Sequence, residues 1–435
     1  MKQTLSILAG KLTFAIGRHF SNCSSLPGKI ALDINKDVLK NIKKENNKII
    51  FITGTNGKTS TTFYSYNAIK SYEKNVVTNL SGANMLQGVL TEILKNTSSN
   101  TFKDKICVFE VDELTVPLLI KNGLLPDYIV ITNLFDDQVD RYGSKEILAK
   151  TLRESIEQTN ATVILNYENR TLRIISDDLK NKCVFFGVEG KSKDIILKDG
   201  LEYKYINYAD VGLFRNVGDS EFKDLRNYIL KYEENKDICE IIENGKSINC
   251  NISNKEKFDI IYNKYNYLAS FTLFKTLVND GVVNYKDNKD ILSFMMSLEV
   301  GNGRMEKFTF LNEDTKLNLV KNPVGLELSL KEYAKENTTF DLLLALGNTP
   351  ADGTDLSWIK TVDFKSFMEN SKVDKFFITG KAVNILKSLL EDYVKENNLN
   401  IYFIEKSAIK ESLTKKTLFL AGFSELKEIR DFIKG

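Results

Sequence analysis

The chain has 435 residues, of which 42% are hydrophobic and 27% charged, and its 60 basic and 58 acidic side chains leave a formal net charge of +2. A charge so close to balance offers no general attraction for nucleic acid, and we predict no nucleic-acid partner. The single histidine, His19, excludes a Ser-His-Asp or Cys-His hydrolase made from this chain alone, as well as histidine-rich metal centres.

The amino-terminal stretch, residues 1–20, has two open interpretations. It lacks the pattern of a secretory signal, because Lys11 interrupts its apolar run, and no run of about 18 apolar residues occurs anywhere in the chain. It is either an ordinary core-packing helix or an amphipathic helix that touches a membrane surface. Five cysteines without CxxC spacing predict reduced, partly buried thiols in the cytoplasm.

Short β-branched runs alternate with segments of helical period in the first half of the chain. This alternation is typical of a parallel sheet with helical crossovers, so we predict an α/β fold. The expected strands are residues 49–54, 75–80, 106–113, 127–134 and 161–166, and the expected helices are residues 58–74, 82–96 and 144–160.

Residues 184–257 lose this pattern and predict hairpins or an inserted β subdomain. Helical period returns at 266–281, and a second α/β alternation follows. Its expected strands are 340–348, 375–380, 399–405 and 417–422, separated by helices near 324–336, 381–397 and 424–434. We therefore predict a central ATP-binding domain over 1–300, with an irregular β-rich insertion at about 184–257, and a smaller doubly wound α/β domain over 301–435.

The stretch "IIFITGTNGKTSTT" joins a strand to a helix through a glycine-rich turn. Such a turn lets backbone N–H groups converge on phosphate oxygens, while Lys58 pairs with the β and γ phosphates and the Thr59 hydroxyl ligates Mg²⁺. Ile52 stands where the full GxxxxGK[ST] spacing has glycine. A surface turn is the alternative, but the flanking strand and helix favour a phosphate loop for ATP.

Carboxylates follow the next two expected strands. In "VFEVDE", Glu110 and Asp112 fall on one face by strand alternation and are candidates to hold Mg²⁺, with a solvated strand end as the alternative. "TNLFDDQVDRYG" carries further carboxylates at Asp136, Asp137 and Asp140. Its "DRYG" matches the DxxG element of GTPases, but the guanine-reading NKxD is absent and a GTPase is not expected.

These motifs occur in the order seen in a known family. "TGTNGKTS", "FEVDE", "TNLFDDQVDRYG", "ILNYEN", "NKYNYLAS" and "GNGRMEKF" resemble Mur ligases, and "LSGANMLQG", "KNPVGLELSL" and "ADGTDLSWIKTVDF" resemble the MurT branch. The resemblance implies a Mur-ligase-like fold and an ATP- and Mg²⁺-dependent carbon-nitrogen ligase of peptidoglycan and cell-wall biosynthesis, on which cell shape depends.

In that branch, ATP phosphorylates the D-glutamate α-carboxylate of lipid II, and ammonia converts the acyl phosphate to D-isoglutamine. The resemblance therefore implies a heterodimer with a GatD-like glutaminase subunit that supplies ammonia, acting in the cytoplasm at the inner face of the membrane. Because a glutaminase needs a Cys-His pair, the histidine-poor chain agrees with this division of labour.

The resemblance also implies roles for individual residues. It assigns the triphosphate to Gly54, Thr55, Asn56, Gly57, Lys58 and Thr59, and magnesium to Glu110, beside the Thr59 ligand that the phosphate-loop pattern predicts. Asn263 and Asn266 fall on an asparagine pair near the nucleotide, and Arg304 on an arginine that faces the phosphates. The alternatives are that the asparagines cap a helix and that Arg304 is a surface residue.

Asp355 matches the aspartate that the MurT branch lends to its partner's catalytic Cys-His pair. Lys58 and Arg304 would be catalytic at a different place, on opposite sides of the transferring phosphoryl group. Its alternative is a loop aspartate in an Asx turn. Trp358 suits either an interface or the core.

Three departures limit the resemblance. Gln138 stands where many Mur ligases have a histidine ligand for a second magnesium. Lys150 is out of register with their carbamylated lysine, and we do not assign it. Relatives often carry a four-cysteine zinc ribbon within 184–257, whereas this chain has only Cys239 and Cys250 there, so we expect no zinc.

Two other functions stay open at this point. One is an ATP-dependent amino-acid ligase of the Mur or folylpolyglutamate type, in which an amine replaces ammonia. The other is a non-catalytic ATP-binding scaffold that only activates its partner.

Overall fold

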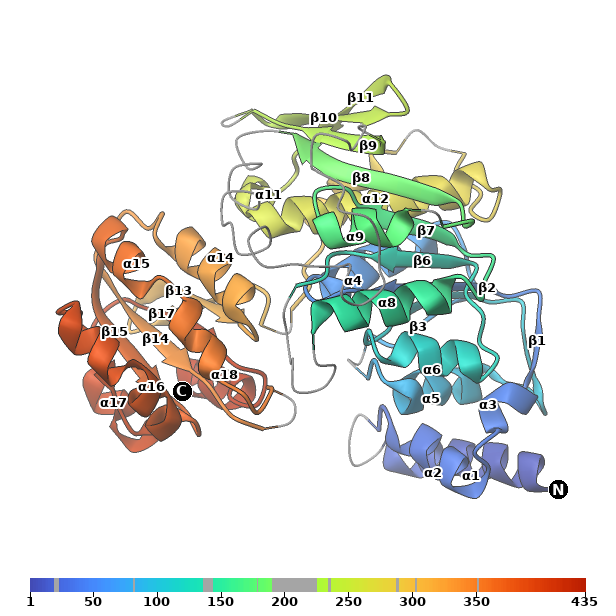
Figure 1. Ribbon diagram of the computed structural model, residues 1–435, viewed down its shortest axis with the longest axis horizontal. Coiled ribbons are helices and arrows are strands. Elements are labelled where there is room, and N and C mark those ends of the chain that lie inside the picture. Colours follow the sequence, from blue (N-terminus) through green and yellow to red (C-terminus); the bar gives the residue numbers. More distant parts are fainter. Residues whose placement is uncertain are drawn as a thin grey trace. The chain divides into compact units, whose positions relative to one another are not determined.

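The computed structural model describes residues 1–18, 23–80, 83–135, 144–177, 179–189, 225–233, 236–286, 289–301, 303–349 and 352–435. The chain divides into two compact units. The first comprises Met1–Leu134 and Ser144–Leu298, and the second consists chiefly of Glu299–Gly435. Each unit is built on its own twisted sheet (Figure 1).

The first unit alternates helices and strands. Its helices are α1 (Lys2–Gly17), α2 (Leu26–Ile34), α3 (Val38–Asn41), α4 (Lys58–Lys70), α5 (Leu86–Asn96), α6 (Thr115–Lys121), α8 (Lys145–Ile156), α9 (Arg170–Ser176), α11 (Lys255–Asp259), α12 (Ile261–Asn279) and α13 (Ile291–Ser297). Its strands are β1 (Lys43–Glu45), β2 (Lys48–Thr53), β3 (Val76–Thr78), β4 (Thr101–Lys103), β5 (Ile106–Glu110), β6 (Tyr128–Ile131), β7 (Thr162–Asn166), β8 (Cys183–Glu189), β9 (Arg226–Lys231), β10 (Ile238–Glu243) and β11 (Lys246–Asn251).

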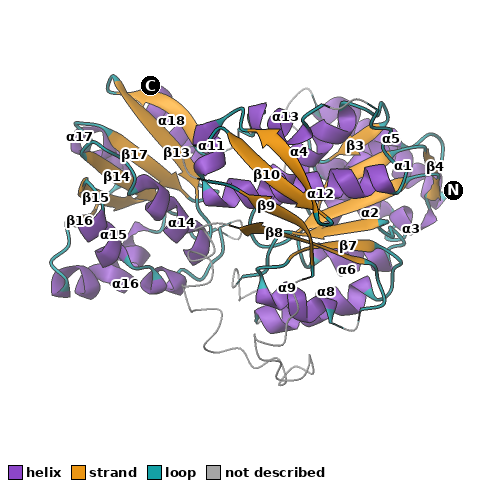
Figure 2. Cartoon of the chain, turned by 90° about the horizontal axis from the view of Figure 1, so that it is seen from above, coloured by secondary structure: helices purple, strands orange, loops and turns teal. Residues whose placement is uncertain are grey.

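The main sheet of this unit has the order β11-β10-β9-β8-β7-β6-β2-β5-β3. The strands from β3 to β9 pair in parallel, and the hairpin β10–β11 closes the far edge antiparallel. Figure 2 shows α4 and α12 on one face and α6, α8 and α9 on the other. Because both faces are covered, the central strands are continuous apolar runs, as in the fully buried Ile50, Phe51 and Ile52.

Strand β2 lies between β5 and β6, and the chain proceeds from β2 toward β3 on one side before it returns to β6 on the other. The order of strands therefore reverses at β2. The carboxyl ends of β2, β5 and β6 meet at one edge of the sheet, where open α/β sheets bind their ligands. This arrangement brings the turns after residues 53, 110 and 131 together.

The second unit contains β12 (Glu306–Phe310), β13 (Glu313–Leu319), α14 (Pro323–Tyr333), β14 (Phe340–Ala345), α15 (Phe364–Asn370), β15 (Val373–Thr379), α16 (Val383–Glu396), β16 (Ile401–Phe403), α17 (Ile409–Ser412), β17 (Thr417–Ala421) and α18 (Leu426–Lys434), with 3-10 helices at Ser357–Thr361 and Lys406–Ala408. Its sheet has the order β12-β13-β17-β14-β15-β16, parallel except for the β12–β13 hairpin. Separate apolar clusters cover its two faces.

The predicted α/β class is confirmed in both units, and all nine strands named from the sequence are present. Seven of them are shorter than predicted, whereas β2 is shifted by one residue and β15 begins two residues earlier. The described parts of the stretch 184–257 include β9, β10 and β11, which extend the main sheet beyond β8, and Asn244 and Gly245 turn the β10–β11 hairpin with positive φ. Most of the residues between β8 and β9 lie outside the described ranges.

Candidate functional site

The turn between β2 and α4 requires glycine at two positions. Gly54 and Gly57 have φ values of +124° and +85°, in the region that other residues rarely adopt. A side chain at Gly54 would come within 2.7 Å of the Asn133 carbonyl oxygen, and one at Gly57 would collide with the Asn266 amide. The backbone of this turn is therefore packed closely against β6 and α12, as a loop that cradles a ligand must be.

Hydrogen bonds from the end of β6 fix the shape of the turn. The backbone N–H groups of Thr55 and Asn56 donate to the carbonyl and side-chain oxygens of Asn133, each at 2.9 Å, and the Thr132 hydroxyl donates to the Asn56 carbonyl at 2.6 Å. Sequence reasoning missed Thr132 and Asn133 as parts of this site. Their place directly after a buried strand, in "ITNL", was the available signal.

The amino terminus of α4 gives the site a positive electrostatic potential. The first N–H groups of a helix have no partner within the helix, and the helix dipole adds positive potential there. Lys58 begins α4 and Thr59 follows it, both partly exposed. Ile52, where the full phosphate-loop motif has glycine, is fully buried within β2. The turn is therefore a shorter one that starts at Gly54.

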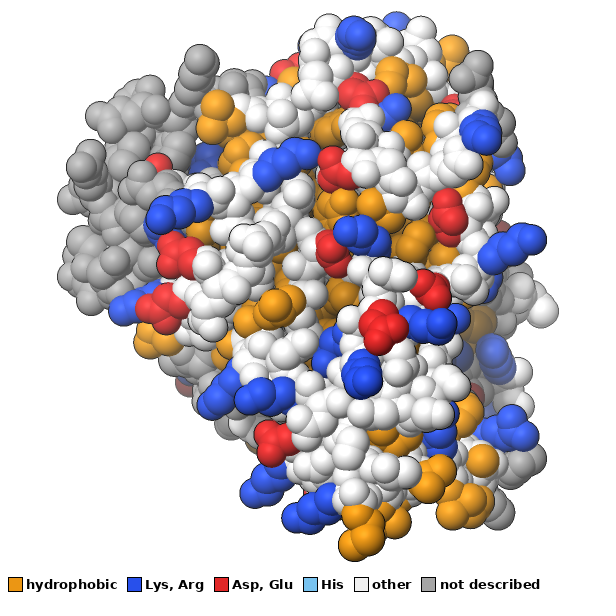
Figure 3. Space-filling model, turned by 90° about the vertical axis from the view of Figure 1, so that its right-hand side faces the viewer, with side chains coloured by type: hydrophobic (Ala, Val, Ile, Leu, Met, Phe, Trp, Pro, Cys, Tyr) orange, Lys and Arg blue, Asp and Glu red, His pale blue; other side chains and the backbone are white. Residues whose placement is uncertain are grey.

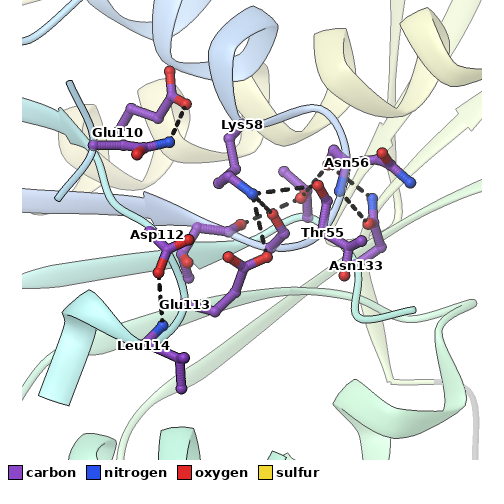
Figure 4. Close-up of polar contacts among 12 residues, drawn as sticks. Thr55, Asn56, Lys58, Glu110, Asp112, Glu113, Leu114 and Asn133 are labelled. Atoms are coloured by element: carbon purple, nitrogen blue, oxygen red, sulfur yellow. Dashed lines mark hydrogen bonds and ion pairs between the residues drawn. The ribbon is translucent and has the colours of Figure 1, made fainter. Parts of the chain in front are cut away.

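Lys58 points across the turn toward β5 (Figure 4). Its ammonium group lies 3.2 Å from the Glu113 carboxylate and also donates to the Thr55 carbonyl at 3.2 Å and to the Gly54 carbonyl. Both side chains of this ion pair are largely shielded from solvent, with 14% of Lys58 and 12% of Glu113 exposed. The sequence had not singled out Glu113.

Glu110 ends β5 beside the turn. Asn79 accepts a hydrogen bond from the Glu110 backbone N–H at 2.8 Å, and the Asn84 amide donates to Glu110 Oε1 at 3.0 Å. The second carboxylate oxygen, Oε2, is buried without a hydrogen-bond partner among the described residues. A buried, unsatisfied carboxylate oxygen at the carboxyl edge of a sheet fits a ligand of a hard cation such as Mg²⁺.

The side chain of Asp112 makes different contacts from that of Glu110. The prediction that the two lie on one strand face is wrong because β5 ends at Glu110, so strand alternation stops there. Asp112 instead accepts a hydrogen bond from the Leu114 backbone N–H at 3.2 Å and starts the turn into α6.

Asn263 and Asn266 both lie inside α12, which begins at Ile261, so the helix-capping alternative is wrong. Asn266 faces the phosphate turn: its side chain contacts Gly57 and accepts a hydrogen bond from the Thr61 hydroxyl at 3.5 Å. One turn further along, the Ser270 hydroxyl donates to the Thr61 carbonyl at 3.1 Å. Asn263 donates to the Lys257 carbonyl at 2.9 Å.

Arg304 and Asp355 belong to the second unit. Arg304 is partly exposed in the turn before β12. Asp355 is exposed and accepts a hydrogen bond from the Ser357 backbone N–H at 2.8 Å, the geometry of an Asx turn. Hydrogen bonds from the backbone and side chain of Ser357 hold the pKa of Asp355 below its usual value, so it is an ionised carboxylate at neutral pH.

Hydrogen bonds of Asp352 connect the segment that carries Asp355 to the residues that follow β14 and β17. Asp352 accepts hydrogen bonds from the Thr349 hydroxyl at 2.6 Å and from the Ser424 backbone N–H, after β17, at 2.9 Å. Burial alone would raise the pKa of Asp352, but the hydrogen bonds from Thr349 and Ser424 stabilise its ionised form more strongly, so its pKa is lowered. Trp358 is partly buried and packs against the apolar core of the unit.

Several predicted features lie outside the described residues: His19, Asp136, Asp137, Gln138 and Asp140. Among the residues that are described, no group of three or more His, Cys, Asp or Glu side chains is arranged to hold a metal.

Cys239 and Cys250 are cross-strand partners in the β10–β11 hairpin, and burial raises the pKa of Cys239 to about 12. No described helix is both long and apolar enough to cross a membrane.

Family models match two parts of the chain. The model described as "Mur ligase middle domain" matches residues 52–274, which contain the phosphate turn, Glu110 and Asn266. The model described as "MurT ligase C-terminal" matches residues 319–424, which contain Asp355. The first match alone spans half of the chain.

Curated relatives and solved structures agree with these matches. The chain is 30% identical to the MurT subunit of lipid II isoglutaminyl synthase (glutamine-hydrolyzing) from Streptococcus pneumoniae, over 85% of this chain and 82% of the relative. It is 27% identical to the subunit of the same name from Staphylococcus aureus, over 97% and 92%. Its fold is similar to that of MurF ligase from Thermotoga maritima in complex with ADP, with a TM-score of 0.60 and 15% identity over 93% of this chain and 83% of that one. The chain therefore belongs to the Mur ligase family of ATP-dependent ligases and, within it, to the MurT branch.

Proposed function

We propose that this chain is the synthetase subunit of a lipid II isoglutaminyl synthase. It would use ATP to convert the D-glutamate α-carboxylate of lipid II to a carboxamide, with ammonia from a GatD-like glutaminase subunit. The observation that carries the proposal is the pairing of a preshaped phosphate turn, residues 54–59, with a Glu110 oxygen at the same sheet edge that is buried without a hydrogen-bond partner among the described residues. The names of the MurT relatives supply the substrate and the use of glutamine.

In the first step, a carboxylate oxygen of the substrate attacks the γ-phosphorus of ATP. The bond to the bridging oxygen breaks, ADP leaves, and an acyl phosphate forms. The turn's backbone and the α4 amino terminus bind the phosphates, and Lys58 neutralises charge on the transferring group. Thr59 and Glu110 would hold Mg²⁺, which supplies further charge neutralisation when bound. Asn263 and Asn266 would contact the nucleotide, and Arg304 would face the phosphates.

In the second step, the ammonia nitrogen attacks the acyl carbon, inorganic phosphate leaves with the C–O bond pair, and the nitrogen loses a proton. Only ammonia, and not ammonium, has the lone pair that this step needs. Asp355 is ionised and exposed, which suits an aspartate that orients a partner's imidazolium for glutamine hydrolysis. The lipid-linked substrate requires action at the membrane surface.

Amidation of purified lipid II tests this proposal. The chain with ATP, Mg²⁺ and an ammonium salt should convert the carboxylate to the carboxamide, as detected by mass spectrometry, and glutamine should serve only when the glutaminase subunit is added. Turnover that requires an amino acid instead of ammonium would identify an amino-acid ligase. Nucleotide binding without any turnover, with partner and lipid II present, would identify a scaffold.

A further inference from the structure

Helix α1 exposes a continuous apolar stripe. Leu5, Leu8, Leu12 and Ile16 are 56%, 59%, 61% and 54% exposed. Their spacing of three and four residues places all four on one face of the helix. Every other described helix exposes at most one large apolar side chain.

The opposite face of α1 is firmly packed, so the stripe does not result from a loosely attached helix. Ile7 and Gly10 are buried, and Gly10 lies so close to Leu94 of α5 that a side chain there would clash. Gln3 donates to the Val38 carbonyl at 3.1 Å and to the Asn100 side chain at 2.9 Å. The outer stripe is therefore a fixed surface of the first unit.

The segment of the sequence that carries the stripe is basic. No acidic residue precedes Asp33, whereas four basic residues do: Lys2, Lys11, Arg18 and Lys29. Lys2 and Arg18 are exposed at the two ends of the stripe. In Figure 3, hydrophobic side chains gather with basic ones at the lower end of the face shown, where Figure 1 places α1 and α2.

We propose that the stripe formed by Leu5, Leu8, Leu12 and Ile16 docks on an anionic lipid bilayer. An apolar face on a helix that carries basic residues and no acidic ones is complementary to the interface between acyl chains and negative headgroups. The sixteen residues of α1 extend only about 24 Å, which is less than the thickness of the hydrocarbon core of a bilayer. We therefore expect α1 to lie in the membrane interface and not to span the bilayer. The inference deepens the proposed function, and to that extent rests on it, because a docked α1 would hold the enzyme where lipid-linked substrate resides.

Vesicle flotation tests the docking surface without nucleotide, glutamine or lipid II, so its result does not depend on the reaction. The full chain should float with vesicles of phosphatidylcholine and phosphatidylglycerol, and less with phosphatidylcholine alone or at high salt. The combined variant Leu5→Gln, Leu8→Gln and Leu12→Gln should lower the bound fraction by at least about tenfold. The charge variant Lys2→Glu with Arg18→Glu should lower it on anionic vesicles only.

A matched control replaces exposed apolar residues of the second unit, Ile385→Gln with Phe423→Gln, and should float like the unaltered chain. Unchanged thermal unfolding and unchanged amidation of a water-soluble substrate analogue would establish that the α1 variant is folded and active. The proposal is overturned if the unaltered chain does not float with anionic vesicles or if the triple variant floats equally well. It is also overturned if the triple variant loses self-association in solution while its flotation is unchanged, because the occupant would then be a second copy of the chain.

Discussion

The Lys58 ammonium and the Glu113 carboxylate form an ion pair at 3.2 Å across the phosphate turn (Figure 4). Two turn carbonyls, those of Gly54 and Thr55, accept hydrogen bonds from the same ammonium. A bound triphosphate must therefore compete with these acceptors for Lys58, and it must also tolerate the negative charge of Glu113.

Glu113→Gln should tighten the binding of ATP measured in the absence of divalent cations. Removing one negative charge near the phosphates is worth on the order of 1 to 3 kcal/mol after solvent screening, so we expect a Kd lowered about tenfold. Isothermal titration calorimetry measures this directly. Glu92→Gln, which removes the carboxylate paired with Lys95 at 2.7 Å, changes the net charge equally and should leave the Kd unchanged. Weaker ATP binding in Glu113→Gln would contradict this account of the ion pair.

Lys58→Ala should abolish amidation with ammonium and with glutamine alike, with a loss of at least about a hundredfold in kcat/KM, because both routes need the same phosphoryl transfer. Lys95→Ala, which removes a lysine of α5 from its ion pair with Glu92, is the matched control and should retain activity. If Lys58→Ala kept either route, the lysine would not contact the transferring phosphoryl group.

Glu110→Gln should raise the Mg²⁺ concentration needed for half-maximal activity by roughly tenfold or more, since it removes a carboxylate ligand. In metal-free buffer the same variant should unfold at an unchanged or higher temperature, because the native Glu110 has a buried oxygen without a hydrogen-bond partner among the described residues. A Mg²⁺ dependence identical to that of the unaltered chain would exclude Glu110 as a ligand.

The sequence predicted the strand, the turn and the helix around residues 49–70 because glycine spacing and apolar runs are local signals. It did not predict the contact between Asn266 and Gly57, because that contact depends on α12 packing against α4, about 200 residues away in the chain. The resemblance to Mur ligases, not the pattern, had pointed to Asn266.

The prediction from strand alternation was also wrong beyond the end of β5. It grouped Asp112 with Glu110, but β5 ends at Glu110, and the turn that follows directs Glu113 toward Lys58. The hairpin β12–β13 was missed for a different reason. It is an edge hairpin whose charged residues, such as Lys307 and Asp314, mask the apolar alternation.

Asp355→Asn should impair amidation driven by glutamine while sparing amidation driven by ammonium. Asparagine preserves the hydrogen bond from the Ser357 backbone N–H and removes only the charge. The matched control is Asp363→Asn in the same segment, which caps α15 by accepting a hydrogen bond from the Ser366 N–H at 2.9 Å. The two routes are compared by mass spectrometry with the glutaminase subunit present. Equal losses in both would refute the role of Asp355.

A crystal structure with Mg²⁺ and a non-hydrolysable ATP analogue tests the central claim most directly. The account predicts the β and γ phosphates within the turn of residues 54–59, with Lys58 moved from Glu113 onto the phosphates and Mg²⁺ on Glu110 Oε2. A nucleotide bound elsewhere, with the Lys58–Glu113 pair intact and the turn empty, would contradict it.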